Sequence, residues 1–571
     1  MTGGGAGDTA QLLAQARAWL DQDPDPETRD ELETLIVAAE AGSSEAVADL
    51  HSRFDERLAF GTAGLRGEIA AGPNRMNRVL VAQAAAGFGR WLLEHAEGGA
   101  TPSVVIGYDG RKNSDVFARD TAELMAGAGI RAILLPRLLP TPVLAFAVRH
   151  LAASAGVMVT ASHNPPNDNG YKVYLGGDDH GSQIVPPTDG EIAAHILDVA
   201  RGSVGDLPRS DRYEVAGEDV VEAYVEATSA VAVGDGPRDA VRFVYTAMHG
   251  VGWRTAHEVF SRAGFSEPVP VTAQLEPDPA FPTVAFPNPE EPGAMDLSFA
   301  AAREAGVDLV IANDPDADRL AVAVPDATSD AGFRRLSGNE VGALLGWRAA
   351  ELAVAAGGDG GAVGTLACSI VSSPALSAVA RAYGLDFADT LTGFKWVSRA
   401  PGLVYGYEEA LGYLVNPETV RDKDGISAAV AFLDLAADLA ARGATIADRL
   451  DEFAERFGFF ASDQISLRVA ELSRIGEIMQ ALRSTPPDRL GDVRVTRIDD
   501  LRDGFGSLPP SDVLRIHLED GSRVMVRPSG TEPKLKIYID ASSDEGTLEE
   551  RRTTATARVA ALTEAMRALT S

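Results

Sequence analysis

The sequence predicts an α/β protein of four domains, three of them related α/β units with mixed, mostly parallel sheets and the last an α+β domain. Three observations support this fold class. A chain of 571 residues is long enough for roughly four domains of about 150 residues each. Strand-like and helix-like stretches alternate repeatedly between Val104 and Ala441, which indicates βαβ units. After about Phe460 an apolar–polar alternation takes over, which indicates antiparallel strands.

Residues 1–58 are predicted to be an N-terminal helical extension that packs on the first domain. Apolar residues recur at helical spacing in two runs, Leu12–Leu20 and Leu32–Ala39. We identify no residues in this extension that indicate chemistry.

The first α/β domain is expected over residues 59–236. Its predicted elements follow a βαβαβ order, with strands at 104–109, 132–136 and 156–160 and helices at 114–128 and 141–150. The buried strand Val157–Val159 is followed by small, polar and turn-forming residues that expose the hydroxyl of Ser162. Ligands bind beyond the carboxyl ends of strands in open α/β sheets. The alternative is that Ser162 caps a helix or that Asn164-Pro165 forms a turn.

The remaining domains are expected over residues 237–340, 341–460 and 461–571. The second begins with a strand at Val241, continues through a helix after Trp253 and reaches a strand at 309–314. The third has strands at 362–370 and 403–407, and the helix Ile426–Ala441 is expected to close it. The last contains a hairpin around Asp520-Gly521, a strand at 534–542 and a helix at 548–569.

Composition excludes several classes of function. Lysine and arginine number 51 and aspartate and glutamate 83, a net charge of −32, which argues against nucleic-acid or anionic-membrane partners. Cys368 is the single cysteine, which excludes an internal disulfide and argues against a thiolate metal cluster. No apolar run approaches about 20 residues and no secretory signal is apparent, so we expect a cytoplasmic protein. An anionic substrate must then be attracted by a local basic cluster.

Asp314–Arg319 carries three alternating carboxylates, Asp314, Asp316 and Asp318, directly after a predicted strand. Oxygen ligands at this density suit a hard divalent cation, and Mg²⁺ is the common partner of phosphoryl groups. The alternative is a solvated acidic turn. Arg319 cannot lose its charge and is a candidate partner for a phosphate or a phosphoserine.

The loop Arg527–Lys534 has the composition of a phosphate-binding loop. Arg527 can contact phosphate through two hydrogen bonds, Ser529 and Thr531 offer hydroxyls, and Gly530 lets backbone N–H groups approach closely. The chain contains no Gly-Lys-Ser/Thr sequence, so a nucleotide P-loop is absent.

Glu408 and Glu409 follow a predicted strand in the loop 406–410. Paired carboxylates can serve as acid and base groups. We favour the alternative that they accept hydrogen bonds from neighbouring sugar hydroxyls.

Five segments in this order resemble the α-D-phosphohexomutase superfamily: FGTAGLRG at 60–67, TASHNP at 160–165, DPDADR at 314–319, the glutamate loop and RPSGTEPK at 527–534. The resemblance runs from about Phe60 to the C-terminus. It implies four domains around a central cleft, each contributing one loop. It also implies an isomerase that is an intramolecular phosphotransferase, with Mg²⁺, a sugar bisphosphate activator and a phosphorylated monosaccharide as ligands. A monomer or homodimer is expected.

The resemblance implies a role for each candidate residue. Ser162 carries the phosphate and joins Asp314, Asp316 and Asp318 as a metal ligand, while Lys172 and Lys423 are bases or phosphate contacts near it. The implied substrate-binding residues are Arg66, His163, Arg319, Thr392, Gly393, Lys395, Glu408, Ala410, Arg527, Ser529, Gly530, Thr531 and Lys534.

One departure bears on the substrate. The residue two beyond the glutamate is usually serine in the hexomutases, and here it is Ala410. With the segment 421–425, RDKDG, this loop resembles the branch that contains phosphopentomutase and glucose-1,6-bisphosphate synthase activities beside phosphoglucomutase.

We predict a mutase that interconverts the 1- and 6-phosphates of glucose, mannose or both. The main alternative is a phosphopentomutase acting on ribose or deoxyribose phosphates. A sugar bisphosphate synthase, a sugar phosphatase and a binding protein without catalysis are weaker alternatives. Conversion of a sugar 1-phosphate to a 6-phosphate without release of inorganic phosphate separates a mutase from a phosphatase or a binding protein.

Overall fold

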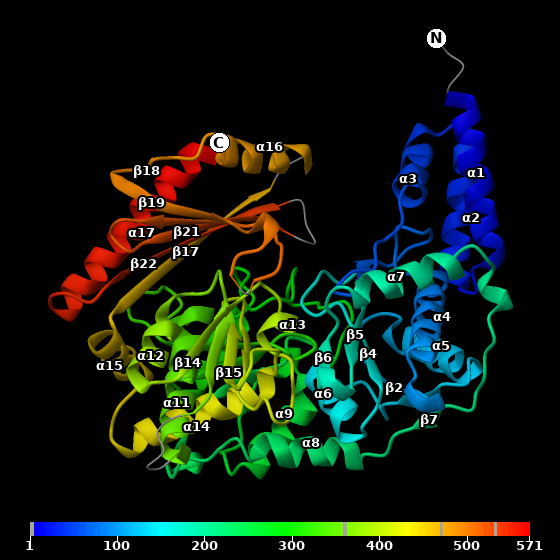
Figure 1. Cartoon of the computed structure of the whole chain (residues 1–571). Helices are drawn as coiled ribbons and strands as arrows, with labels where there is room; N and C mark the ends of the chain where they lie inside the picture. The colour runs from blue at the N-terminus through cyan, green and yellow to red at the C-terminus, as the bar shows by residue number, and fades with distance from the viewer. Residues whose placement is uncertain (1–4, 358–362, 469–471, 507, 530–533, 571) are drawn as a thin grey trace. The chain divides into compact units, whose positions relative to one another are not determined.

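The computed structural model describes residues 5–357, 363–468, 472–506, 508–529 and 534–570 (Figure 1). The chain divides into two compact units. The first contains the chain up to Val233, Arg238–Arg335 and Asn416–Leu433, and the second contains Gly234–Pro237, Leu336–Val415 and the chain from Asp434 onward. Within the described residues the strands form four sheets, two in each unit.

The N-terminal part of the first unit is helical. It consists of α1 (Gly5–Gln22), α2 (Pro26–Glu40) and α3 (Ser44–Phe54). Asp25 and Ser43 cap α2 and α3 by accepting hydrogen bonds from backbone N–H groups of the first turn. Leu12, Trp19 and Leu32 belong to the same hydrophobic cluster as residues of the first sheet and its helices.

The first sheet has the strand order β1-β5-β4-β2-β3-β7, with β6 paired to β5. Its strands are β1 (Leu65–Glu68), β2 (Ser103–Tyr108), β3 (Arg131–Leu134), β4 (Ala155–Val159), β5 (Asp168–Leu175), β6 (Ser182–Gln183) and β7 (Glu214–Val215). The helices around it are α4 (Arg78–Glu94), α5 (Ser114–Gly127), α6 (Thr141–His150) and α7 (Thr188–Val199). Every residue of β4 is buried, as expected for a strand covered on both faces.

The second sheet has the order β12-β11-β10-β8-β9. Its strands are β8 (Val244–Thr246), β9 (Val269–Pro270), β10 (Val310–Asn313), β11 (Leu320–Pro325) and β12 (Phe333–Arg335). The accompanying helices are α8 (Asp219–Ser229), α9 (Gly252–Arg262) and α10 (Asp296–Ala305).

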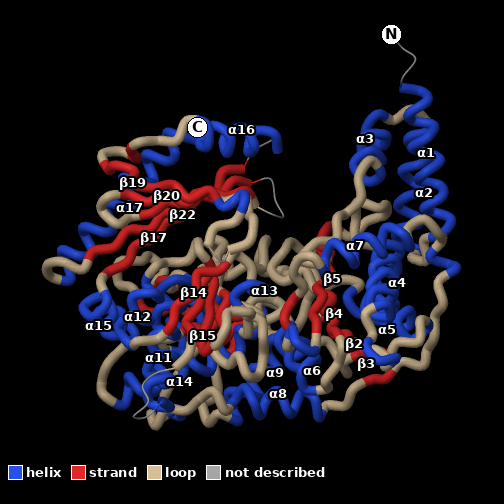
Figure 2. Tube along the Cα trace, viewed as in Figure 1, coloured by secondary structure: helices blue, strands red, loops and turns tan. Residues whose placement is uncertain are grey.

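The second unit contains one mixed and one antiparallel sheet, whose strands are red in Figure 2. The mixed sheet, β14-β13-β15-β16, is built from β13 (Thr365–Ser369), β14 (Asp386–Thr390), β15 (Leu403–Glu408) and β16 (Gly412–Leu414), with α11 (Gly338–Gly357), α12 (Ala375–Tyr383), α13 (Phe394–Val397) and α15 (Ile446–Phe457). The antiparallel sheet, β17-β22-β21-β20-β19-β18, is built from β17 (Phe459–Arg468), β18 (Arg489–Leu490), β19 (Val493–Asp500), β20 (Leu514–Leu518), β21 (Arg523–Pro528) and β22 (Lys534–Ser543), with α16 (Leu472–Ser484) and α17 (Leu548–Thr570).

The helix expected to close the third domain, α14 (Gly425–Ala441), does so only in part. Its first half and the preceding segment, Asn416–Leu433, pack with the first unit. From Asp434 onward the helix packs with the second unit, where Arg348 forms ion pairs with Asp434 and with Asp438. Helical periodicity predicts that this helix forms, but an apolar surface on several sides gives no preference between two partners.

Three candidate loops occupy the same position in their sheets. β4, β10 and β15 each pair in parallel with an earlier strand and in antiparallel with the strand that follows along the chain. The loops therefore close hairpins at the carboxyl ends of parallel strands. Each contains a non-glycine residue in the left-handed region, with φ of 50° at Ser162, 54° at Ala317 and 63° at Leu411. Such strain is concentrated at functional sites.

Candidate active site

Ser162 stands directly after β4 with its side chain held in place. Its N–H donates to Thr160 Oγ1 at 2.8 Å, and the residue is only 2% exposed. Its Oγ donates to Asp314 Oδ2 at 2.8 Å and lies 3.2 Å from His163 Nδ1. The serine that the sequence singled out is therefore in contact with the first aspartate of the predicted metal loop.

Arg111 fixes the loop that carries Ser162. Its guanidinium donates to four backbone carbonyls of that loop, those of Ser162, Asn164, Pro165 and Asp168, at 2.5–3.2 Å. The guanidinium is buried and its Nε lies 3.6 Å from Asp109 Oδ2. Because a planar fork of donors satisfies several carbonyls at once, this side chain determines the backbone course around the serine.

The three aspartates form a buried cage in the hairpin loop between β10 and β11. One carboxylate oxygen from each of Asp314, Asp316 and Asp318 lies within 4.8 Å of the others. Asp316 Oδ1 and Asp318 Oδ1 are buried and accept no hydrogen bond from any described residue. Buried carboxylate oxygens normally have partners, and oxygen donors are what Mg²⁺ prefers. The residues therefore fit a divalent cation.

Lys172 and Lys423, from distant parts of the chain, both reach this cage. Lys172 Nζ donates to Asp316 Oδ2 at 2.8 Å and to Asp318 Oδ2 at 3.0 Å, and Lys423 Nζ lies 3.3 Å from Asp318 Oδ2. Burial lowers the pKa of Lys172, but Asp316 and Asp318 outweigh this effect and the net pKa lies above the ordinary value. Lys172 is therefore a cation in this arrangement, which suits phosphate contact better than proton abstraction.

The pKa values of the cage carboxyls are displaced in opposite directions. Burial, and then the charges of Asp316 and Asp318, raise the pKa of Asp314 well above its ordinary value. Burial also raises the pKa of Asp316, but Lys172 and the hydroxyl of Thr141 reverse this, so that its pKa lies below the ordinary value. A bound divalent cation would remove the repulsion that disfavours ionised Asp314.

The imidazole of His163 is neutral in these surroundings. Burial lowers its pKa well below the ordinary value, and the positive charges of Arg319 and Arg66 lower it further. Arg319 Nε lies 4.0 Å from Asp314 Oδ2 and 3.8 Å from Asp318 Oδ1. Arg66 donates to Asn164 Oδ1 at 3.2 Å. Four cationic side chains, Arg66, Lys172, Arg319 and Lys423, thus surround three carboxylates.

In the second unit the predicted sugar-binding loop is half-buried. The N–H of Gly393 donates to Glu408 Oε1 at 2.6 Å, which joins the segment of Thr392, Gly393 and Lys395 to that glutamate. Glu409 is held differently, because its Oε2 accepts from Ser369 and Ser372 at 3.1 and 3.0 Å. Ala410, which follows, offers no side-chain hydrogen bond.

Tyr538 on β22 connects this loop with the predicted phosphate loop. Burial raises the pKa of its hydroxyl, Glu409 raises it further and Arg527 lowers it. The hydroxyl therefore lies close enough to both Glu409 and Arg527 for their charges to affect its pKa. The N–H of Ser529 donates to the carbonyl of Lys534 at 2.8 Å, which closes the hairpin. Gly530 and Thr531 lie outside the described residues.

The sequence did not point to Arg111 or Thr141. Thr141 donates its Oγ1 to Asp316 Oδ2 at 2.6 Å and its N–H to the carbonyl of Asp316 at 2.9 Å. Both residues follow strands of the parallel part of the first sheet, Arg111 after β2 and Thr141 after β3. Ligands bind beyond the carboxyl ends of such strands, and this rule could have identified Arg111 and Thr141 as candidate site residues from the sequence.

Comparison with models of known protein families shows which family this chain belongs to. Models of the phosphoglucomutase/phosphomannomutase family match in order: alpha/beta/alpha domain I at residues 57–201, domain II at 222–328, domain III at 337–457 and the C-terminal domain at 467–557. The chain belongs to this family. It is a member of the α-D-phosphohexomutase superfamily, as its motifs indicated.

Relatives with several names share most of its length. A protein of Haemophilus influenzae named "Probable phosphomannomutase" is 54% identical over 467 residues, covering 82% of this chain and 93% of its own. Human phosphopentomutase is 34% identical over 584 residues, covering 95% of this chain and 94% of its own. The crystal structure of parafusin, a Paramecium phosphoglucomutase, has a TM-score of 0.68 at 19% identity, over 89% of this chain and 95% of its own; it shows a shared fold.

The protein is therefore a phosphohexomutase-type mutase, an isomerase that works as an intramolecular phosphotransferase. Members of the family use Mg²⁺, and the buried aspartate cage can bind a metal. Among the described helices, none is both long and apolar enough to cross a membrane.

Proposed function

We propose that the enzyme moves a phosphoryl group between C1 and the terminal hydroxymethyl carbon of an aldose phosphate, through a phosphorylated Ser162 and a sugar bisphosphate. The observation that carries this proposal is the 2.8 Å contact between Ser162 Oγ and Asp314, inside a buried cage of three carboxylates and several cations. A serine placed only as a helix cap has no need of such surroundings.

In the first half-reaction a free hydroxyl of the sugar phosphate attacks the phosphorus on Ser162. The new P–O bond forms as the P–Oγ bond breaks, the hydroxyl loses its proton and Oγ regains one. The proton that the sugar hydroxyl loses is the one that Oγ gains, and we assign His163, whose Nδ1 lies 3.2 Å from Oγ, to hydrogen-bond with Oγ during the transfer. The bisphosphate then reverses its orientation and returns its other phosphoryl group to Ser162.

Asp314, Asp316 and Asp318 would hold Mg²⁺, which when bound neutralises charge on the transferring phosphoryl group. We assign contacts with the phosphate oxygens to Lys172, Lys423 and Arg319. The reaction needs positioning and charge neutralisation more than a strong base. In the second unit we assign the sugar hydroxyls to Glu408 and the second phosphate to Arg527, Ser529 and Lys534, with Gly530 and Thr531 in the same loop.

For the substrate we propose glucose 1-phosphate, with mannose 1-phosphate accepted, and ribose or deoxyribose 1-phosphate as the second candidate. Ala410 supports the second candidate because it lacks the serine hydroxyl, and a site with fewer polar contacts rejects wrong substrates less strongly. The names of the relatives include both hexose and pentose mutases.

The test compares kcat/KM for these four sugar 1-phosphates in the presence of a sugar bisphosphate activator, while free inorganic phosphate is monitored. We expect turnover without phosphate release and a discrimination below about 10³-fold, equivalent to about 4 kcal/mol. A larger hexose preference would refute the argument that Ala410 leaves the site with too few polar contacts to reject wrong substrates strongly. Stoichiometric release of inorganic phosphate would refute the mutase reaction.

A further inference from the structure

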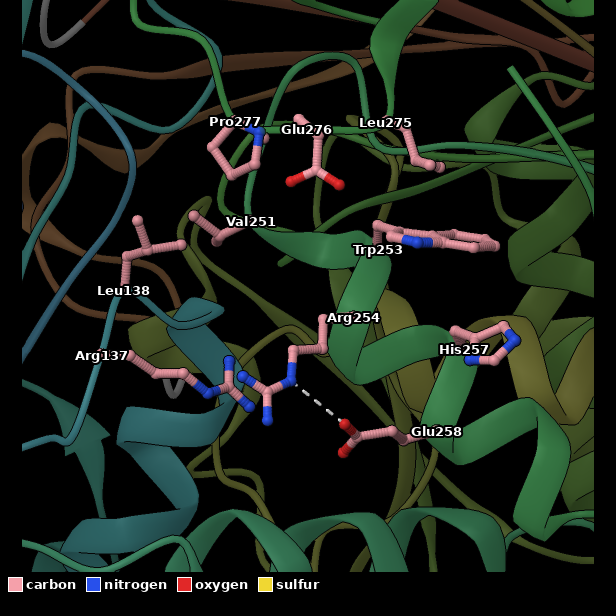
Figure 3. Close-up of a pocket in the computed structure, with 11 residues that line it drawn as sticks. Arg137, Leu138, Val251, Trp253, Arg254, His257, Glu258, Leu275, Glu276 and Pro277 are labelled. Atoms are coloured by element: carbon pink, nitrogen blue, oxygen red, sulfur yellow. Dashed lines mark hydrogen bonds and ion pairs between the residues drawn. The ribbon is translucent and has the colours of Figure 1, made fainter. Parts of the chain in front are cut away.

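A pocket of about 340 Å³ lies in the first unit, apart from the residues assigned to the candidate active site (Figure 3). Arg137 and Leu138, between β3 and α6, form one side, and another is formed by residues at and just before the start of α9: Gly250, Val251, Trp253 and Arg254. The segment Leu275–Pro277 completes it. Its volume lies at the lower end of the range of roughly 300–1,000 Å³ for small-molecule sites, which suits a ligand of monosaccharide size.

Two arginines converge in this pocket. Figure 3 shows the guanidinium groups of Arg137 and Arg254 pointing toward one another. Arg137 Nε donates to Glu218, but its Nη2 is buried and has no hydrogen-bond partner in the described chain. Arg254 Nε donates to Glu258 at 3.3 Å, and its side chain is 59% exposed. Facing guanidinium groups repel unless an anion lies between them, and their forked geometry matches phosphate.

The opposite side of the pocket has a different chemistry. Glu276 lies across from the two arginines, and Trp253 lines the pocket to one side of them. An ionised carboxylate only accepts hydrogen bonds, so it suits hydroxyl groups and repels a second anion. A half-buried indole offers an apolar face to a sugar ring. The pocket thus has an anion end, a ring-sized apolar wall and a hydroxyl end.

Two walls of the pocket continue into the metal loop. Shortly after Leu138 the chain reaches Thr141, whose hydroxyl donates to Asp316 Oδ2. On the other wall, the N–H of Val251 donates to the carbonyl of Pro315 at 2.8 Å. A Cβ on Gly250 would lie 2.2 Å from that same carbonyl oxygen, so only glycine fits there. A ligand that shifts either wall therefore acts directly on the backbone between Asp314 and Asp316.

We propose that this pocket is a second binding site for a phosphorylated monosaccharide, with its phosphate between Arg137 and Arg254, its hydroxyls on Glu276 and its ring against Trp253, and that occupancy adjusts the metal loop. The ligand is either a substrate or product of this enzyme or a different sugar phosphate. Binding at this pocket is independent of the proposed function, whereas an effect on turnover rests on it.

Equilibrium dialysis of the full chain with glucose 6-phosphate and with ribose 5-phosphate tests the site. We expect two equivalents bound per chain for at least one of these sugar phosphates. In Arg254→Ala one of the two sites should weaken about 10- to 100-fold. The matched control is Arg262→Ala, on the same helix and paired with Glu222 outside the pocket; it should keep both sites. In Trp253→Phe, quenching of the indole by the second equivalent should disappear.

Binding of both sugar phosphates that is the same in Arg254→Ala as in the unaltered protein would overturn the proposal. Equal occupancy by inorganic phosphate or by adenosine monophosphate would overturn the sugar phosphate as its ligand. If the sugar phosphate that fills the second site is also turned over by the enzyme, the ligand is a substrate or product. If only the other sugar phosphate fills it, the ligand is a different sugar phosphate. If turnover is absent, the dialysis result still decides the pocket, so failure of the proposed function is distinguished from failure of this site.

Discussion

The candidate site residues of the two units differ in burial. In the first unit Ser162, Asp314 and Lys172 are buried and each is already held by a partner of the protein itself. In the second unit Glu408, the last residue of β15, and Arg527, near the end of β21, are half-buried. Under the proposed function this contrast corresponds to a division of labour: the groups proposed to transfer phosphate are buried, whereas those proposed to bind the sugar hydroxyls and the second phosphate are more exposed. Changes in the first unit should therefore act on kcat and those in the second on KM.

The largest effect should come from Ser162→Ala. Because it removes the atom proposed to carry the phosphate, mutase activity should fall by at least about 10⁴-fold. Peptide mapping and intact mass should detect phosphate on Ser162 in part of the unaltered protein and none there in the variant. A variant that keeps full activity would show that the transfer does not pass through this serine.

The next effect should come from the aspartate cage. Asp316→Asn removes one of three carboxylates, and the loss of several kcal/mol of charge stabilisation corresponds to a fall in kcat of about 10²- to 10⁴-fold. A metal titration should also show weaker activation by Mg²⁺. Asp211→Asn, an exposed aspartate outside the cage, serves as the control. Undiminished activity of the native enzyme in strong chelator would contradict a metal role.

Arg111→Lys tests whether the buried loop must be positioned. A lysine cannot reproduce four hydrogen bonds to carbonyls, and a displacement of about 1 Å at the reacting serine can cost about 100-fold in rate. We expect kcat to fall by about that factor with KM little changed and slower phosphorylation of Ser162 by a sugar bisphosphate. Arg119→Lys, exposed on the neighbouring helix, is the matched control. Equal losses in both variants would remove the positioning role.

Arg527→Ala probes the second unit. One charge-assisted contact to phosphate is worth roughly 1.5–3 kcal/mol, so KM should rise about 10- to 100-fold. Phosphorylation of Ser162 should persist, because the serine belongs to the first unit. A fall in kcat at constant KM would break the proposed division between the units.

The smallest effect concerns stability, through the buried carboxyl of Asp424, which is next to Lys423 in the chain. Burial raises the pKa of Asp424 to about 6, against hydrogen bonds from Ser427 and Tyr224 that lower it. Since the folded pKa exceeds the unfolded value of 3.8, the contribution of Asp424 to the free energy of unfolding is most favourable below about pH 4 and is lost as the pH rises to about 6. The loss amounts to about 3 kcal/mol.

Asp424→Asn should remove this dependence. Relative to the unaltered protein, the thermal midpoint of the variant should rise progressively between about pH 4 and pH 6 and then stay constant. A difference that does not change with pH would show that Asp424 titrates normally in the folded chain.

The sequence by itself determined the local helices and strands, and it predicted the kind of metal site and the family. Apolar periodicity predicted α5, α6 and β4, and the spacing of Asp314, Asp316 and Asp318 predicted an oxygen-rich metal site, because both depend on residues within a few positions of one another. The hairpin of β20 and β21 followed from alternation around Asp520-Gly521 for the same reason. The five motif segments were sufficient to indicate the family.

Only the tertiary structure decided which distant groups share one environment. Lys172 and Lys423 are ordinary lysines in sequence, yet packing buries both against Asp318. Arg111 has no local pattern to show that it holds the serine loop. The division of α14 between two units depends on which surfaces meet its apolar sides. These outcomes follow from long-range packing and from the need of each buried charge for a partner, and neither is encoded within a short window of residues.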